Sequence, residues 1–354
     1  MSNVSITTFN CGKLFPFDNN DAINSVLDAI IPKQSENFDL IVLGLQEFSL
    51  IWECLTPDIV TRQINQVSDQ ILTYLGSGYN LVAAANTGGT VIFIYTKNTV
   101  TVQTLVRNNC HRGVLGSSLK GGVSLTLQIS NSMLSDSIET FTFICCHLAA
   151  NEGPQNVQYR IDDVKSILES CNDQIPSFLL KNSLLFFFGD LNFRVNPSII
   201  NNNGDELLNL LETNEAFKKF NEPKIHFDKT YKYVLYDENN VFNEKRVPSW
   251  CDRILYRSMN KNDDIDIISY DSLPRVTALL FTDHQPVRLN FTTKGVSRSS
   301  SDSVVWKRSD DNTHEFHYGD VLIGYADWCR YRRMHYWTIP IVILVYFIQA
   351  LFFK

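Results

Sequence analysis

The sequence predicts a layered α/β domain in which helices cover two sheets. Short apolar segments of strand length alternate with longer, more polar segments of helix length from the first residues to about residue 293. Hydrophobic residues make up 44% of the chain and charged residues 19%, as is typical of a globular core. The first segments have the order strand–helix–strand, and no internal repeat is evident.

The strands and helices can be placed from their composition and length. Strands are expected at 4–9, 40–45, 80–85, 90–96, 100–106, 123–129, 140–146, 183–188, 253–257 and 286–291. Helices are expected near 20–31, 57–75, 155–171 and 205–220. We interpret 90–106 as a hairpin and 4–45 as a strand–helix–strand unit. The sheets should therefore contain both antiparallel and parallel pairs.

The chain divides into three parts. Residues 1–294 form the folded domain. Residues 295–335 are rich in serine and mixed in charge, and we interpret them as a flexible linker with a basic end, in which 321–333 could form a short helix. Residues 336–353 form a third, strongly apolar segment.

This apolar segment, YWTIPIVILVYFIQALFF, has the length of a membrane-spanning helix and no charged residue. Aromatic residues lie at both of its ends, as they do at membrane interfaces. Arg330, Arg332 and Arg333 precede it and only Lys354 follows, so the folded domain is expected in the cytosol. The alternative is a buried C-terminal core helix, which Pro340 slightly favours.

Charge and cysteine content narrow the class of protein. The formal net charge of −7 argues against a nucleic-acid partner, but it leaves room for a local basic pocket. The eight cysteines show no CxxC pairing, and no signal peptide precedes the first strand. We therefore expect reduced thiols in the cytosol.

Polar side chains follow or precede the predicted strands where these strands end. In layered α/β proteins such ends share one edge, so the groups should converge on one cleft. They are mostly oxygen donors without cysteine, which favours Mg²⁺ over zinc. A metal, a base for water and donors to phosphoryl oxygens are what hydrolysis of a phosphate ester requires. The residues concerned are Asn10, Glu47, His147, Asp190, Asn192, Asp252, Asp283 and His284.

Eight short motifs, in this order, resemble those of the inositol polyphosphate 5-phosphatases, within the endonuclease/exonuclease/phosphatase superfamily. They cover residues 4–292 and are FNCGK (9–13), LQEF (45–48), LKGGVSL (119–125), CHLAA (146–150), GDLNFR (189–194), TYKY (230–233), PSWCDRIL (248–255) and TDHQPV (282–287). GDLN and DH are common to the superfamily, whereas WCDRIL, TYKY and HLAA are more specific. The resemblance implies a two-sheet, four-layer α/β sandwich followed by a C-terminal transmembrane helix.

The chain looks most like the small tail-anchored fungal members of this family. That resemblance implies phosphatidylinositol 4,5-bisphosphate as the lipid substrate. It also implies a single-pass anchor in the endoplasmic reticulum membrane.

The resemblance also implies roles for individual residues. Glu47 matches the principal Mg²⁺ ligand, with Asn10 close by. Asp190 would polarise the attacking water and Asn192 would hold water or phosphate in line. His284 would contact the phosphoryl oxygens, and Asp252 would orient His284. Asp283 would support the residues on the metal side, and His147 would donate a hydrogen bond to the scissile phosphate.

Specificity is expected in and near the TYKY segment. Tyr231, Lys232 and Arg246 match residues that hold the neighbouring 4-phosphate in the family. Lys120 lies in a glycine-flanked turn, from which it could reach the inositol ring or its 1-phosphate. Arg194 is expected to brace its loop rather than to contact substrate.

Several positions depart from the family pattern. Gln285 replaces a usual Lys or Arg after the Asp-His pair, which could weaken phosphate binding, and Arg246 lies in a basic pair one residue short of the usual spacing. Cys145-Cys146, Asn151 and Lys229 also differ from common family residues, but no predicted metal ligand is lost. We therefore expect an active enzyme. The alternatives are a nuclease or sphingomyelinase of the same superfamily, or a tail-anchored scaffold that has lost catalysis.

Overall fold

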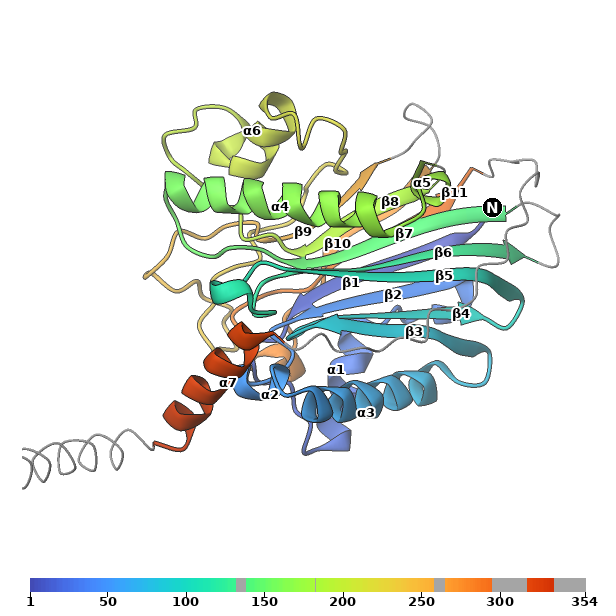
Figure 1. Cartoon of the computed structure of the whole chain (residues 1–354), viewed down its shortest axis with the longest axis horizontal. Helices are drawn as coiled ribbons and strands as arrows, with labels where there is room; N and C mark the ends of the chain where they lie inside the picture. Colours follow the sequence, from blue (N-terminus) through green and yellow to red (C-terminus); the bar gives the residue numbers. More distant parts are fainter. Residues whose placement is uncertain (132–137, 182, 258–264, 295–316, 334–354) are drawn as a thin grey trace, which may run out of the picture.

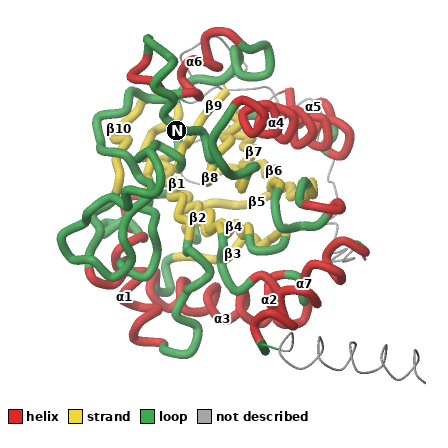
Figure 2. The backbone as a smooth tube through the Cα atoms, turned by 90° about the vertical axis from the view of Figure 1, so that its left-hand side faces the viewer, coloured by secondary structure: helices red, strands yellow, loops and turns green. Residues whose placement is uncertain are grey.

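Two mixed β-sheets lie face to face, and helices cover their outer sides. The computed structural model describes residues 1–131, 138–181, 183–257, 265–294 and 317–333. In Figures 1 and 2 the helices α1 and α3 lie outside one sheet, and α4 and α5 lie outside the other. The predicted two-sheet α/β sandwich is confirmed.

The first sheet has the strand order β10-β11-β1-β2-β4-β3. Strands β1 (Asn3–Asn10) and β2 (Leu40–Gln46) are parallel and are joined through α1 (Asn20–Ile30). The other pairs are antiparallel and involve β3 (Tyr79–Thr87), β4 (Thr90–Lys97), β10 (Ile265–Ser272) and β11 (Val287–Thr293). Helices α2 (Ile51–Cys54) and α3 (Pro57–Leu75) follow β2.

The second sheet has the order β5-β6-β7-β8-β9. Its strands are β5 (Val100–His111), β6 (Gly121–Asn131), β7 (Ile138–His147), β8 (Leu184–Asp190) and β9 (Asp252–Arg257). The parallel pair β7/β8 is joined by α4 (Pro154–Gln174) and α5 (Ser177–Lys181). Helix α6 (Glu206–Thr213) begins after Asp205, whose carboxylate accepts hydrogen bonds from two backbone N–H groups of its first turn.

The apolar run that precedes Asp190 is central strand β8, buried on both faces. Phe186 and Phe188 pack into the core between the sheets, while Leu185 and Phe187 pack on the α4 side. Such a strand has no polar face, which explains its continuous hydrophobic sequence.

The sheets approach closely beside this strand. A Cβ added at Gly44 would lie 2.4 Å from the Phe188 ring. The glycine is therefore needed for close packing between the two sheets.

Three sequence-based predictions of secondary structure were wrong in detail. Residues 90–106 do not form a hairpin, because β4 pairs with β2 and β3 in the first sheet while β5 pairs with β6 in the second. Strand β10 was missed, because its largely exposed residues give little alternation. Helix α6 ends at Thr213, and residues 214–220 form turns instead of the predicted helix.

One described helix lies within the region predicted as linker and juxtamembrane segment. Residues Tyr318–Tyr331 form helix α7, close to the predicted helix 321–333, and it packs against α2 and the short 3₁₀ turn η2 (Val114–Gly116). Within the described ranges, no helix has the length and apolar character needed to cross a membrane. The predicted spanning segment 336–353 lies outside these ranges, as do residues 295–316 of the predicted linker.

Candidate active site

A cleft of about 310 Å³ opens where strands of both sheets end. Three of its polar groups are fixed by the register of the second sheet, because His147, Asp190 and Asp252 are consecutive partners across β7, β8 and β9. Asn10 and Gln46 are partners at the corresponding end of the first sheet. The predicted convergence of strand ends on one cleft is therefore present.

Ten of the twelve predicted site residues line this cleft. They are Glu47, Lys120, His147, Asp190, Asn192, Tyr231, Lys232, Arg246, Asp283 and His284. The other two, Asn10 and Asp252, are buried behind it and hydrogen-bond to residues that line it. The structure thus brings all twelve together, although it does not assign their roles.

Asp190 lies at the centre of the cleft as a buried anion. Its Oδ2 accepts a hydrogen bond from Asn10 Nδ2 at 2.8 Å and lies 3.3 Å from His147 Nε2 and 3.9 Å from His284 Nε2. Burial alone would raise the pKa of Asp190, but the two imidazoles outweigh it and hold the pKa well below its ordinary value. Asp190 is therefore ionised at neutral pH.

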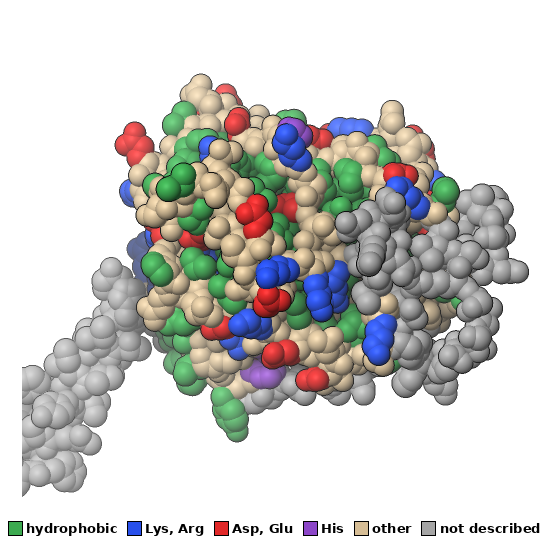
Figure 3. All heavy atoms as spheres, turned by 90° about the horizontal axis from the view of Figure 1, so that it is seen from above, with side chains coloured by type: hydrophobic (Ala, Val, Ile, Leu, Met, Phe, Trp, Pro, Cys, Tyr) green, Lys and Arg blue, Asp and Glu red, His purple; other side chains and the backbone are tan. Residues whose placement is uncertain are grey.

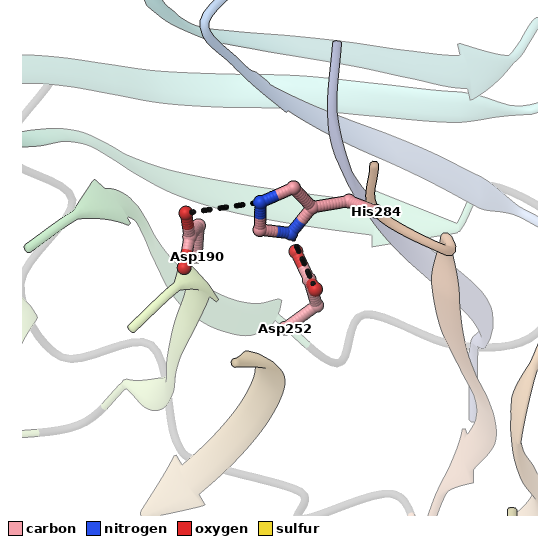
Figure 4. A group of neighbouring side chains, drawn as sticks. All are labelled: Asp190, Asp252 and His284. Atoms are coloured by element: carbon pink, nitrogen blue, oxygen red, sulfur yellow. Dashed lines mark hydrogen bonds and ion pairs between the residues drawn. The ribbon is translucent and has the colours of Figure 1, made fainter. Parts of the chain in front are cut away.

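His284 and Asp252 form a buried ion pair next to Asp190 (Figure 4). His284 Nδ1 lies 2.9 Å from Asp252 Oδ2, which also accepts a hydrogen bond from Thr230 Oγ1 at 2.7 Å. Burial opposes the charge, but Asp252 and Asp190 raise the pKa of His284 to about 9. The imidazolium therefore presents its Nε2–H group toward the cleft.

Asp190, Asp252 and His284 place one ligand atom each within 4.8 Å of one another, as a metal site would. A metal ion there would require a neutral imidazole with a free lone pair. His284 Nδ1 is paired with Asp252, as in many metal-binding histidines, and Asp252 and Asp190 raise the pKa of the ring. The spacing of the three groups thus fits a metal site at which a metal ion would have to displace the His284 proton.

The surroundings of Glu47 fit a hard cation better. Its carboxylate is about a quarter exposed and lies 3.4 Å from Lys13 Nζ and 3.8 Å from His147 Nε2. Burial would raise the pKa of Glu47, but His147, Lys120 and Lys13 together lower it. The support for a cation at this position is therefore the ligand itself, a partly open and ionised carboxylate of the kind that hard divalent ions prefer.

Asn10, predicted beside the metal, has a different set of contacts. Its amide oxygen accepts a hydrogen bond from Gly12 N at 2.9 Å, and its amide nitrogen donates to Asp190. In this structure Asn10 therefore orients the central carboxylate.

Basic side chains outnumber acidic ones along the cleft. The lining has five Lys or Arg residues, Lys13, Lys120, Arg194, Lys232 and Arg246, against the three carboxylates of Glu47, Asp190 and Asp283. The cleft is thus locally basic in a chain of net charge −7, an arrangement that the sequence had left open. Elsewhere the charges are mixed: on the face in Figure 3, Lys and Arg are interspersed with Asp and Glu, without an extended basic surface.

The predicted specificity residues lie on one wall of the cleft. Lys232 Nζ is 2.8 Å from Asp283 Oδ2, and Arg246 Nη2 donates to Asn151 Oδ1 at 3.2 Å. The Tyr231 ring packs against His284, with 4.6 Å between ring centroids. The side chains of Lys232 and Arg246 thus line the same cleft as Asp190 and His284.

Two charged cleft residues, Lys13 and Arg194, were not assigned to the site from the sequence. Lys13 belongs to the FNCGK motif, and its position three residues after a strand end was the available signal. Arg194 was expected to brace its loop: it contacts Asn192 Oδ1 and stacks on Tyr231 at 4.4 Å, yet it also lines the cleft.

The side chain of Gln285 is hydrogen-bonded to neighbouring residues and does not line the cleft. Its amide donates to Leu273 O at 2.7 Å, and its oxygen accepts from Tyr233 Oη at 2.9 Å. Its side chain therefore serves local structure at a position where a cation was expected.

Residues 7–290 match the profile of endonuclease/exonuclease/phosphatase family 2. The chain belongs to this family. The predicted resemblance to its inositol polyphosphate 5-phosphatases is also supported by relatives. The match covers the whole folded core and every residue of the cleft described above.

Two relatives illustrate the similarity. Type IV inositol polyphosphate 5-phosphatase 11 of Arabidopsis thaliana is 27% identical over 285 residues, covering 75% of this chain and 77% of the relative. Human phosphatidylinositol 4,5-bisphosphate 5-phosphatase A is 27% identical over 321 residues, covering 81% of this chain but only 30% of the relative. The family member described here thus spans less than a third of the human protein.

A solved structure shares the fold. The inositol polyphosphate 5-phosphatase domain of SPsynaptojanin, in complex with inositol (1,4)-bisphosphate and calcium ion, superposes with a TM-score of 0.61 at 23% identity. The match covers 82% of this chain and 83% of that one. It confirms the two-sheet architecture of the family.

Proposed function

We propose that this protein hydrolyses the 5-phosphate of phosphatidylinositol 4,5-bisphosphate in a Mg²⁺-dependent reaction. The observation that carries the proposal is the ionised Asp190 between two histidines, in a cleft whose other walls are basic. Family membership supports phosphate-ester hydrolysis, and the names of the relatives support an inositol phosphate substrate.

In the proposed reaction, the residues of the cleft position the attacking water next to the phosphorus atom of the 5-phosphate. The ionised Asp190 accepts a hydrogen bond from the attacking water and orients it, with the Asn192 side chain at the same strand end. The His284 imidazolium donates to a non-bridging phosphoryl oxygen on which negative charge accumulates.

His147 differs from His284 in charge. Burial and the nearby Lys120 lower the pKa of His147, so it is a neutral imidazole whose Nε2 lies against Lys120 Nζ. Mg²⁺ held at Glu47 would supply further neutralisation of the phosphoryl charge.

The 4-phosphate is assigned to the opposite wall. Lys232 is held by Asp283, and Arg246 projects from the loop 243–247, so both cations are close to the reacting centre. A spectator phosphate is best recognised by cationic side chains of this kind. Lys120, beside His147, is left for the inositol ring or its 1-phosphate.

We further propose that residues 336–353 anchor the protein in the endoplasmic reticulum membrane, with the catalytic domain in the cytosol. Support comes from the sequence: an uncharged apolar segment with aromatic ends and arginines on one side. Localisation of the full chain compared with a chain that ends at residue 333 tests this proposal. Unchanged membrane association of the shorter chain would refute it.

Phosphate release by the full chain with Mg²⁺ tests the activity. The substrates are the 4,5-bisphosphate, 4-phosphate and 5-phosphate forms of phosphatidylinositol, each assayed with wild type, Asp190→Ala and the control Asp271→Asn, an exposed carboxylate on β10. We expect turnover of the 4,5-form above the 5-form, a loss of about 10²-fold or more in Asp190→Ala, and no change in the control.

Other outcomes would favour the alternatives. Equal turnover of the 4,5- and 5-forms would retain a phosphatase but refute the 4-phosphate assignment. Release from DNA or sphingomyelin instead would indicate another branch of the superfamily. No release from any of these substrates would favour a scaffold.

A further inference from the structure

Helix α7 docks beside the cleft through two carboxylates. Asp320 Oδ1 accepts hydrogen bonds from Ser118 N at 2.6 Å and from Ser118 Oγ at 3.0 Å. Two turns further along the same face of the helix, Asp327 Oδ2 accepts a hydrogen bond from Trp52 N at 3.2 Å. The backbone of α7 approaches η2 closely at Gly319, because a Cβ added there would be 2.4 Å from Leu115 O.

Both segments that receive α7 lead directly into the cleft. Ser118 is two residues before Lys120, and Trp52 is five residues after Glu47. Helix α7 therefore contacts the chain five residues from the proposed metal ligand and two residues from a cation of the cleft. In Figure 1 it lies at the end of the sandwich where β5 and β6 meet η2.

The connection between β5 and β6 depends on its contacts for its shape. It is closed by hydrogen bonds from Arg112 N to Lys120 O at 2.8 Å and from Gly113 N to Ser117 O at 2.9 Å. Ser118 N is instead directed to Asp320, a charge-assisted bond from outside the connection. Removing this acceptor leaves the Ser118 amide, two residues from Lys120, without its partner.

A second contact links the same turn to the segment of Glu47. Ser118 O packs on Gly88, where a Cβ would lie 2.3 Å away, and Gly89 O accepts a hydrogen bond from Phe48 N at 3.1 Å. The path from α7 through Ser118 and Gly88-Gly89 to the Glu47 segment is thus continuous. The position of Lys120 matters because its flexible side chain must hold the ammonium group against His147.

We propose that α7 is a positioning element of the active site, in which Asp320 fixes the turn 117–120 and thereby places the Lys120 ammonium group. The inference rests on the proposed function for its kinetic test. It predicts that a helix outside the catalytic core sets catalytic efficiency without contacting substrate. Asp320 is accordingly a positioning residue.

The test uses the full chain and a short-chain, water-soluble 4,5-bisphosphate lipid, so that membrane attachment does not limit turnover. We expect Asp320→Ala to lower kcat/KM by about 10-fold. Asp320→Asn, which keeps one acceptor oxygen, should recover most of the activity. Leu322→Ala, at an exposed position of the same helix, should match wild type.

A double-mutant cycle separates positioning from general stability. If Asp320 acts through Lys120, then Asp320→Ala should change kcat/KM by less than about twofold in a Lys120→Ala background. An equal loss in both backgrounds, or wild-type kcat/KM in Asp320→Ala, would overturn the proposal. Thermal unfolding of each variant identifies a loss that is due to unfolding.

Amide hydrogen exchange provides a readout without turnover. In Asp320→Ala we expect faster exchange in the peptide 113–121, with the strands of the second sheet unchanged. Unchanged exchange of this peptide would refute the coupling. If wild type releases no phosphate, the proposed function fails, while this measurement still decides the coupling.

Discussion

Replacing Asp252 with asparagine removes the charge that keeps His284 protonated. With a pKa of about 9, His284 is about 99% protonated at pH 7. At its ordinary value of 6.5 only about a quarter would be protonated. The difference corresponds to about 3 kcal/mol in favour of the imidazolium in the native protein.

The direction of the pH effect follows from the raised pKa. The stabilisation by the ion pair is complete below about pH 6.5 and is lost as the pH rises through about 9. In Asp252→Asn the alkaline limb of the kcat/KM profile should therefore move from near pH 9 toward pH 6.5. At pH 8 we expect a loss of about 10²-fold or more, because both the charge and the orientation of His284 change.

The assay is phosphate release between pH 5.5 and 9.5, with the His284 ring followed by NMR. Asp271→Asn serves as the control for loss of a remote carboxylate. An alkaline limb and a His284 titration that both stay in place in Asp252→Asn would refute the assigned cause of the raised pKa.

Three further substitutions test other parts of the site and the fold. Glu47→Gln should raise the Mg²⁺ concentration for half-maximal activity by about tenfold or more, because one ligand charge is lost; an unchanged Mg²⁺ titration would place the metal elsewhere. Lys232→Met should lower kcat/KM for the 4,5-form by about 10- to 100-fold and for the 5-form far less, and equal losses would contradict a 4-phosphate contact. Gly189→Ala should destabilise the fold by about 4 kcal/mol or more in urea unfolding, because Gly189 has φ +141° and its Cβ would lie 2.0 Å from Cys146 O; a wild-type midpoint would be inconsistent with this packing.

Most of the sandwich was predictable because its elements carry local signals. Strand β8 is a continuous apolar run, and α1 buries one regular face, Ile23, Val26, Leu27 and Ile30. The division of the strands between the two sheets was not predictable. Only two residues separate β4 from β5, and such a short connection is typical of a hairpin. Each strand pairs instead with partners distant in sequence.

The candidate site was predictable as a set of residues but not as an arrangement. Strand ends indicated where the polar groups meet. Which of them lie behind the cleft depends on packing: Asp252 is fully buried beneath His284, and Asn10 beneath Asp190. The docking of α7 had no local signal, because Ser118 and Asp320 are 202 residues apart.

Helix α7 and the end of strand β11 lie at opposite ends of the sandwich. Strand β11 ends beside the N-terminus, where Thr293 Oγ1 accepts a hydrogen bond from Ser2 N at 2.6 Å, whereas α7 packs against α2 and η2 at the end that carries the cleft. About the length of β5, roughly 40 Å of sheet, separates them. The docking of α7 therefore depends on its own contacts with α2 and η2, and the same surface on a second copy of the chain can receive it, which is the geometry of a domain swap.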